Sequence, residues 1–368
     1  MLTLEERPFS FDEMIGQKGI LKEMKKRSKT MDFPPVMIFE GASGTGKTTL
    51  AYIIASLLCD SNPIINKDGS KSPNPESSIC KAVRANRFNA DIIFKDASSM
   101  GKDDVNQLAE SLSIAPMFGD KKVLIIDEAQ ELGKLAKGAT LTLLEKRRVD
   151  TYIILCTMNI DAFDKAVKSR GALYKFKSPT SEEIAEYLMT LTDKFNIPCD
   201  DAHMEFFQKG LFTIADSCDG SVRMAVQNFE RAVLGEFFTV AEIEREFGVI
   251  SNEKMASLMN RLAAQDKEVI ADIRSFGSKD FFYKMFRILT EAYLYQKTQY
   301  VDQSWKVRTY EPFMKYDLGK ILNTFLKVDA NGYFKEDVFT ISLVEAFYDN
   351  QVSTPTAPVK RVRVPIEG

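Results

Sequence analysis

Short apolar runs alternate with longer segments of helical periodicity through the first 178 residues. Apolar residues recur at helical spacing in 46–59, 103–113 and 136–146. The short runs, rich in β-branched residues, are 36–40, 91–96, 123–128, 152–157 and 173–177. Nearly continuous apolar strands separated by helices are typical of a parallel sheet that is covered on both faces. We therefore expect an α/β domain over residues 1–178.

The strand pattern ends near Ser181, and only helical patterns follow. The segment SEEIAEYLMTLTDKF has a serine that we interpret as a helix cap, followed by two glutamates. Amphipathic helices are expected over 179–240, and a wholly helical stretch over 241–350. Residues 351–368 carry three prolines and a small basic cluster, which predicts a flexible tail.

Composition narrows the class of protein. The mean hydropathy is −0.18, and no apolar run approaches the roughly 20 residues that cross a bilayer. The polar, acidic start does not resemble a signal peptide, and five cysteines without close pairing fit a reducing compartment. We expect a cytoplasmic protein without a membrane partner. A net charge of −3 means that any nucleic acid must meet a local basic surface.

The motif GASGTGKTT follows an expected strand and precedes an expected helix, which is the context of a phosphate-binding loop. Its glycines let several backbone N–H groups face one point, where the helix N-terminus adds a positive field. Lys47 would reach the terminal phosphates of a nucleotide, and Thr48 would hold Mg²⁺. The predicted phosphate-binding residues are Gly41, Ser43, Gly44, Thr45, Gly46, Lys47, Thr48 and Thr49.

A second motif, KKVLIIDEAQ, completes the predicted site. A buried strand that ends at Asp127 would place a carboxylate beside the phosphate loop, where it would join Thr48 as a Mg²⁺ ligand. Glu128 follows, and a carboxylate at this point can polarise an attacking water. Lys47, Asp127 and Glu128 are therefore candidate catalytic residues of an ATP hydrolase.

Residues 7–235 resemble the clamp-loader ATPases of the AAA+ class, which include the gamma/tau subunit of bacterial DNA polymerase III, phage clamp loaders and replication factor C. The resemblance implies an AAA+ nucleotide-binding domain over 1–178, a helical lid over 179–240 and a collar for oligomerisation over 241–350. Beyond residue 250 it rests only on length and helical content. The matching segments are RPFSFDEMIGQ, NRFNADIIFKDASS, FGDKKVLIIDEAQEL, LTLLEK, KSRGALYKFK and GSVRMAV.

The resemblance assigns further residues. Arg170, in the segment SRG, matches an arginine that such proteins extend into the nucleotide site of the neighbouring subunit. Arg223 matches the lid arginine known as sensor 2, and Ile15 and Gly16 match the place where the adenine is bound. The polar sensor 1 residue aligns with Met158, so Thr157 or Asn159 would have to take its role; we assign Asn159 to the cofactor site.

The chain also departs from this family. Gly171 replaces the cysteine that follows the finger arginine. A four-cysteine zinc module is reduced to Cys59 and Cys80, with Asn74 and Ser77 at the two middle positions. Two thiolates do not make a structural zinc site, so we expect no zinc and expect packing to hold residues 60–80. The family's LEEPP has become LEKRR.

The resemblance implies the ATPase subunit of a sliding-clamp loader, with ATP and Mg²⁺ as cofactors. The implied partners are other loader subunits, identical or different, in a pentamer, together with a sliding clamp and primer-template DNA. Lys102, Lys134 and Lys137 are candidate DNA contacts. Two alternatives remain open: another AAA+ DNA motor, for branch migration or recombination, and a loader scaffold that does not hydrolyse ATP. A phage or divergent bacterial source is compatible with the departures.

Overall fold

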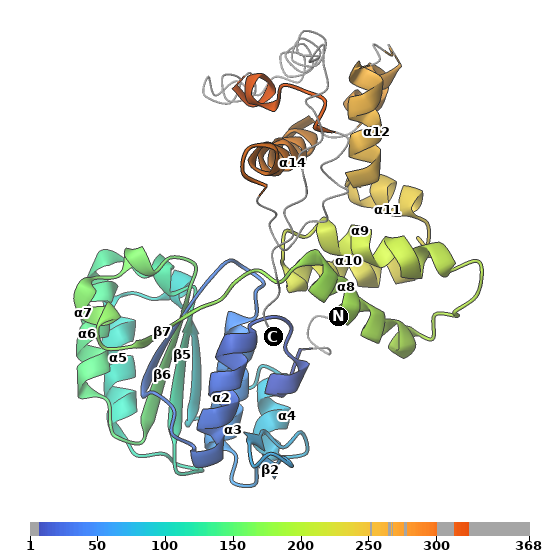
Figure 1. Ribbon diagram of the computed structural model, residues 1–368. Helices are drawn as coiled ribbons and strands as arrows, with labels where there is room; N and C mark the ends of the chain where they lie inside the picture. The colour runs from blue at the N-terminus through green and yellow to red at the C-terminus, as the bar shows by residue number, and fades with distance from the viewer. Residues whose placement is uncertain are drawn as a thin grey trace, which may run out of the picture. The chain divides into compact units, whose positions relative to one another are not determined.

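The computed structural model describes residues 7–250, 252–263, 266, 268–275, 278–299 and 313–323 (Figure 1). Contacts divide the chain into two compact units, Met1–Phe238 and Thr239–Gly368. The first unit holds the expected sheet together with the expected lid. The finer division into three domains stays a prediction, and the expected tail over 351–368 lies outside the described residues.

The first unit contains the five parallel strands that the sequence predicts, in the order β4-β5-β6-β1-β7. Ile38 of β1 pairs with Leu155 of β6 on one side and with Leu173 of β7 on the other. The α/β fold class is therefore confirmed, with small shifts at the strand ends. The strands are β1 (Val36–Glu40), β4 (Ile92–Asp96), β5 (Lys122–Asp127), β6 (Thr151–Thr157) and β7 (Ala172–Lys175).

Helices cover both faces of this sheet, as Figure 1 shows. Because strand side chains alternate between faces, Met37 and Phe39 join one buried cluster and Val36 and Ile38 join the other. The first cluster is closed by α2 (Lys18–Thr30), α3 (Lys47–Cys59) and α4 (Ser78–Arg84). The second is closed by α5 (Lys102–Ser113), α6 (Lys134–Lys146) and α7 (Lys165–Lys168).

Shorter elements connect these helices and strands. A two-stranded antiparallel hairpin, β2 (Ile64–Ile65) and β3 (Lys71–Ser72), was not predicted from the sequence. The single turns of 3-10 helix are η1 (Phe11–Glu13), η2 (Ala97–Ser99), η3 (Ala129–Glu131), η4 (Ile160–Ala162) and η5 (Asp193–Phe195).

The helical segment after the sheet, which we call the lid, consists of α8 (Ser181–Thr192), a π-helical turn η6 (Phe206–Gly210), α9 (Leu211–Asp216) and α10 (Val222–Leu234). Its core includes Phe206, which packs against Phe229 and Phe238 with ring centroids 6.3 and 5.3 Å apart. No strand occurs among residues 178–238, as expected.

The sequence placed the cap of α8 one residue too late. Thr180 is the cap: its hydroxyl accepts a hydrogen bond from the Glu183 N–H at 3.2 Å, and the Glu183 carboxylate accepts one from the Thr180 N–H at 3.3 Å. A side chain reaches the third N–H of a helix only from the position before the first turn. Ser181 lies inside that turn, and its hydroxyl bonds Asp216 of α9 instead.

The second unit is helical in its described residues. Its helices are α11 (Val240–Phe247), α12 (Asn252–Ala263), α13 (Val269–Ser275) and α14 (Ser278–Thr298), and residues 318–323 are also helical. Met255, Leu258, Ile273 and Ile288 form its core with Phe313. Within the ranges described above, no helix is long and apolar enough to cross a membrane.

Candidate functional site

The phosphate-binding loop joins β1 to α3 and depends on glycine at several points. Gly44 and Gly46 have φ angles of +78° and +99°, in the region that favours glycine. A side chain at Gly41 would begin 2.7 Å from the carbonyl oxygen of Phe176. Thr45 closes the turn by donating its hydroxyl hydrogen to the Ala42 carbonyl at 2.9 Å. The predicted loop is therefore formed as the motif requires.

Lys47 begins α3 and is only 6% exposed. Its ammonium group donates to the carbonyls of Gly41 and Ala42, both at 2.8 Å. Burial lowers the pKa of Lys47, although the nearby Glu128 and Asp127 carboxylates act in the opposite direction. The cation is thus held at the loop by weak neutral partners, which an anion can replace.

Thr48 and Asp127 meet although they are 79 positions apart in the chain: the Thr48 hydroxyl donates to Asp127 Oδ2 at 2.8 Å. Burial raises the pKa of Asp127, and the Thr48 hydrogen bond partly offsets that effect. A hydroxyl and a carboxylate are hard oxygen ligands of the kind that Mg²⁺ takes together with phosphate oxygens. The two predicted metal ligands therefore fit such an ion.

Glu128 follows β5 with a left-handed backbone, at a φ of +47°. Its own N–H donates to Asp127 Oδ1 at 3.1 Å, and its carboxylate accepts a hydrogen bond from Gln130 Nε2 at 2.7 Å. Gln130 in turn contacts the end of β6. Sequence reasoning missed Gln130, and its place two residues after Glu128 was the only signal.

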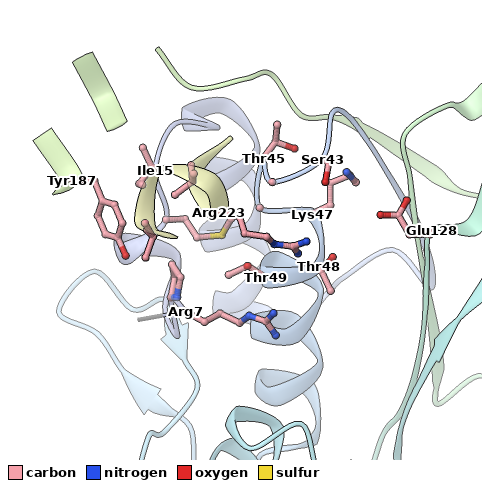
Figure 2. A pocket seen from close by; sticks show the side chains of 16 residues that line it. Arg7, Ile15, Ser43, Thr45, Lys47, Thr48, Thr49, Glu128, Tyr187 and Arg223 are labelled. Carbon is pink, nitrogen blue, oxygen red and sulfur yellow. The ribbon is translucent and has the colours of Figure 1, made fainter. Parts of the chain in front are cut away.

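A cleft of about 840 Å³, including its open mouth, collects residues from four parts of the first unit. Figure 2 shows Ile15 and Tyr187 at one end, and Lys47 and Glu128 at the other. Of the predicted residues, Ile15, Ser43, Gly44, Thr45, Gly46, Lys47, Thr48, Thr49, Glu128 and Arg223 line it. The sequence did not indicate Arg7, Pro8, Met14, Tyr187, Val222 or Val226.

The lid is attached to the phosphate loop where Arg223 enters the cleft. The Val222 N–H, at the start of α10, donates to the Gly44 carbonyl at 3.2 Å. A Cβ at Gly44 would lie 2.2 Å from the hydroxyl oxygen of Ser221, the cap of α10. Only glycine permits this approach, which places Arg223 over the loop.

The segment around Gly16 joins the same attachment. Gly16 has a φ of +63° and packs near Pro179, while the Gln17 side chain bonds both the N–H and the carbonyl of Lys177, at 3.1 and 2.5 Å. These contacts connect the residues before α2 to the linker that leads into the lid. Gly16 itself does not line the cleft.

Asn159 also lies outside the cleft lining. Its side-chain oxygen caps η4 by accepting a hydrogen bond from the Asp161 N–H at 2.8 Å. At the end of β6, the Thr157 hydroxyl and the Met158 N–H both donate to Gln130 Oε1 at 3.0 Å. The assignment of Asn159 to a cofactor stays a prediction.

Arg170 follows α7 and does not line this cleft. Its guanidinium donates to Glu145 Oε1 at 2.5 Å and to the Ala166 carbonyl at 2.8 Å, and its side chain is 38% exposed. A Cβ at Gly171 would lie 2.7 Å from Ile38 Cγ1. That close contact explains why glycine stands where the family has cysteine.

The segment after α3 is held by a carboxylate. Asp60 accepts hydrogen bonds from the N–H groups of Asn62 and Asn74 at 3.1 and 2.9 Å, and contacts the Cys80 thiol at 3.8 Å. From the sequence, we expected packing to hold this segment. Hydrogen bonds contribute as well, because Ser77 caps α4 through the Cys80 N–H at 3.2 Å.

The cysteines differ sharply in exposure. Burial raises the pKa of Cys59 to about 12 and that of Cys80 to about 11. Cys156 and Cys218 are also buried, whereas Cys199, in the lid, is exposed. Among the residues that the structure describes, no three His, Cys, Asp or Glu side chains gather in an arrangement that could hold a metal ion.

Comparison with known proteins agrees with this geometry. Residues 16–180 match the family model described as DNA polymerase III, delta subunit. DNA polymerase III subunit gamma/tau of Mycoplasma genitalium is 28% identical over 80% of this chain and 49% of its own length. Subunit tau of Bacillus subtilis is 27% identical over 72% of this chain and 45% of its own length. The chain thus spans about half the length of these relatives.

Solved structures show a weaker likeness. The RuvB Holliday junction branch migration motor of Thermotoga maritima is 18% identical, with a TM-score of 0.46 over 71% of this chain and 79% of that one. A gamma subunit-related protein of the same organism is 14% identical, with a TM-score of 0.36 over 90% of this chain and 100% of that one. The parallel sheet, the phosphate loop and the matches to gamma/tau subunits make this chain similar to P-loop AAA+ proteins of the clamp-loader group.

Proposed function

We propose that this protein is the ATPase subunit of a sliding-clamp loader, which binds and hydrolyses ATP to open a clamp and place it on primer-template DNA. The contact between Thr48 and Asp127 carries the proposal, since it joins the two halves of a nucleotide site at 2.8 Å. Lys47, Glu128 and Arg223 line the same cleft, and together they supply the charges that phosphoryl transfer needs.

The cleft accommodates a nucleotide in one orientation. The phosphates would lie on the loop from Ser43 to Thr49, with its backbone N–H groups and Lys47. The adenine would lie at the other end, between Ile15 and Tyr187 (Figure 2). The apolar Val226 also lines the cleft. An aromatic ring and aliphatic side chains bind a flat base without hydrogen bonds.

Two groups would bind the metal and one would act on water. Thr48 and Asp127 would hold Mg²⁺, which neutralises charge on the phosphates when it is bound. Glu128 would accept a proton from the attacking water, and Arg223 would place a positive charge on the phosphates from the lid. Because Val222 bonds the phosphate loop, this arginine would link the lid to the nucleotide.

Arg170 would complete the site of a neighbouring subunit. It is exposed, and it lies outside the cleft of its own chain. An arginine that serves the next subunit requires a head-to-tail interface, which repeats until a ring closes or an arc stops. Hydrolysis would then depend on assembly, in a pentamer of identical or different subunits.

An exposed loop at the amino ends of the strands, which we call the apolar tip, would bind the clamp. Ile114, Met117 and Phe118 are 60%, 68% and 68% exposed. The Asp91 carboxylate accepts hydrogen bonds from the N–H groups of Met117 and Phe118, both at 2.7 Å, which holds the loop rigid. This loop leads into β5, so it lies at the amino ends of the parallel strands, whereas the phosphate loop follows a carboxyl end. Exposed contiguous apolar residues mark protein docking sites.

DNA would meet the starts of α5 and α6, where the exposed Lys102 and Lys134 stand. Helix N-termini and lysines bind phosphates without reading bases. Lys137, one turn into α6, lies 5.8 Å from the Phe163 ring and is a weaker candidate.

ATP turnover measured with and without a sliding clamp and primed DNA tests the proposal. We expect the clamp and primed DNA, added together, to stimulate ATP turnover. Glu128→Gln should bind ATP normally and lose turnover by at least about 100-fold, since it removes the general base. Nucleotide binding without turnover in the unmodified protein would indicate a scaffold subunit. Stimulation by branched DNA but not by a clamp would indicate another DNA motor.

A further inference from the structure

One glutamine connects the candidate general base to a second strand. Gln130, in η3, donates from Nε2 to the Glu128 carboxylate at 2.7 Å, and its Oε1 accepts from the Thr157 hydroxyl and the Met158 N–H, both at 3.0 Å. The amide orientation follows from these partners: a backbone N–H can only donate, so the oxygen must face Met158 and the NH₂ group must face Glu128.

The backbone of Glu128 has a conformation that neighbouring residues must stabilise. Its φ of +47° is unfavourable for a residue with a Cβ, and such backbones persist only where the surroundings hold them. Its N–H is bound to Asp127, and its carboxylate is bound to Gln130. The direction of the side chain is therefore set from both ends.

We propose that Gln130 is a positioning residue, which holds the Glu128 carboxylate where it can accept a proton from the attacking water and ties it to the end of β6. This inference rests on the proposed ATPase function. From the sequence, we expected the side chain of Thr157 or Asn159 to take the sensor 1 role. Here the end of β6 acts through Gln130, and the position that aligns with sensor 1 contributes its backbone N–H rather than its methionine side chain.

Thr157 does not need Gln130 to keep its hydroxyl hydrogen-bonded. The Thr157 hydroxyl also bonds the N–H and the carbonyl of Asn159, both at 3.1 Å. A substitution at Gln130 can therefore remove the link to Glu128 without leaving Thr157 unsatisfied, so a catalytic effect can be separated from misfolding.

Two variants divide the glutamine's roles. Gln130→Glu keeps an acceptor for Thr157 and Met158 but replaces the donor to Glu128 with a like charge. Gln130→Met keeps the approximate shape of the side chain and removes both the acceptor for Thr157 and Met158 and the donor to Glu128. If positioning of Glu128 is the role, both should lower kcat on the order of 10–100-fold, with the Kd for ATP unchanged. Gln107→Met, at an exposed glutamine of α5, is the matched control and should leave both unchanged.

The assembled protein with clamp and primed DNA is the system to measure, by single-turnover hydrolysis and equilibrium ATP binding. A wild-type kcat in Gln130→Glu would overturn the proposal, because a merely structural link to β6 survives in that variant. A changed Kd with an unchanged kcat would overturn it too. Glu128→Gln separates this failure from failure of the proposed function: if that variant still turns over, Glu128 is not the base at all.

Discussion

Burial shifts the pKa values of Lys47 and Asp127, the two charged groups beside the phosphate loop, in opposite directions. It lowers the pKa of Lys47 and raises that of Asp127, because a charge in a poorly solvated site is disfavoured whatever its sign. The site therefore holds an ammonium and a carboxylate at a cost to the folded chain. Phosphate and Mg²⁺ are the partners that would compensate for it.

The buried carboxylate predicts a conflict between stability and metal binding. A folded-state pKa above the unfolded value means that protonation of Asp127 favours folding, so its ionised form lowers stability at neutral pH and this penalty fades as pH falls through the folded pKa. Without metal or nucleotide, Asp127→Asn should raise Tm by a few °C, the scale that about 1 kcal/mol produces. The same variant should lose Mg²⁺-dependent ATP affinity.

Thermal unfolding over a pH series, with chelator and without nucleotide, checks the first half of this prediction. The Tm advantage of the variant should shrink as pH falls. A lower Tm for Asp127→Asn at neutral pH would contradict it. Asp103→Asn, at an exposed aspartate of α5 that does not line the cleft, serves as a control for Mg²⁺ dependence in the binding assay.

Single residues were predictable where the chemistry is local in sequence. The phosphate loop has fixed spacing, and Asp127 was predictable because it ends an apolar strand. Arg7 and Tyr187 were not, because they line the cleft from segments far from the phosphate loop in the sequence. Gln130 was not, because its partners include residues at the end of β6. The cap of α8 was misplaced by one residue, since threonine and serine stand side by side and only geometry distinguishes them.

At the scale of elements, the five strands were predictable because each is a buried run between helical patterns. The hairpin of β2 and β3 was not, because two residues per strand carry no periodicity. The lid attachment could not be foreseen either. It depends on the close approach of Ser221 to Gly44. A glycine at this position of a phosphate loop does not indicate that another segment packs against it.

The apolar tip gives a prediction for one loop. Replacing both Met117 and Phe118 by serine should weaken clamp binding by at least roughly 10-fold, because two exposed anchors would lose their contact area. Basal ATP turnover and Tm should change little, since both side chains are 68% exposed and the backbone bonds to Asp91 remain.

Clamp binding by the assembled protein, followed by fluorescence or sedimentation, measures this effect. Leu234→Ser, at a 76% exposed leucine that ends α10, is the matched control. If the double variant bound the clamp as well as the control does, the tip would not be the docking surface.

At the scale of the whole molecule, the proposed mechanism requires Arg170 to act on a site in another subunit. In its own chain it is paired with Glu145 at a partly exposed position. Ion pairs of this kind contribute about 0–1 kcal/mol, so little opposes a turn of the guanidinium toward a neighbouring phosphate. Neither the interface nor its partner could be predicted from one chain's periodicity.

Mixing two inactive variants tests this directly. Lys47→Ala lacks a working phosphate loop but can still place Arg170 in the nucleotide site of its neighbour. Arg170→Ala has a working phosphate loop but no arginine for the neighbouring site. Each alone should be nearly inactive. An equal mixture should recover roughly a quarter of the wild-type rate, because random assembly pairs an intact loop with an intact finger at about one interface in four.

Lys81→Ala, which removes another exposed ion-paired cation, is the control and should be active alone. Native mass measurement would establish that mixed assemblies form. Mixed assemblies without recovered activity would show that Arg170 does not serve a neighbour.

Four of the five thiols lie inside the protein and one stands on the lid surface. A maleimide dye should therefore react with the folded chain at Cys199 alone, without any engineering of the other cysteines. The lid would then carry an optical reporter, and its motion on nucleotide addition could be followed in real time.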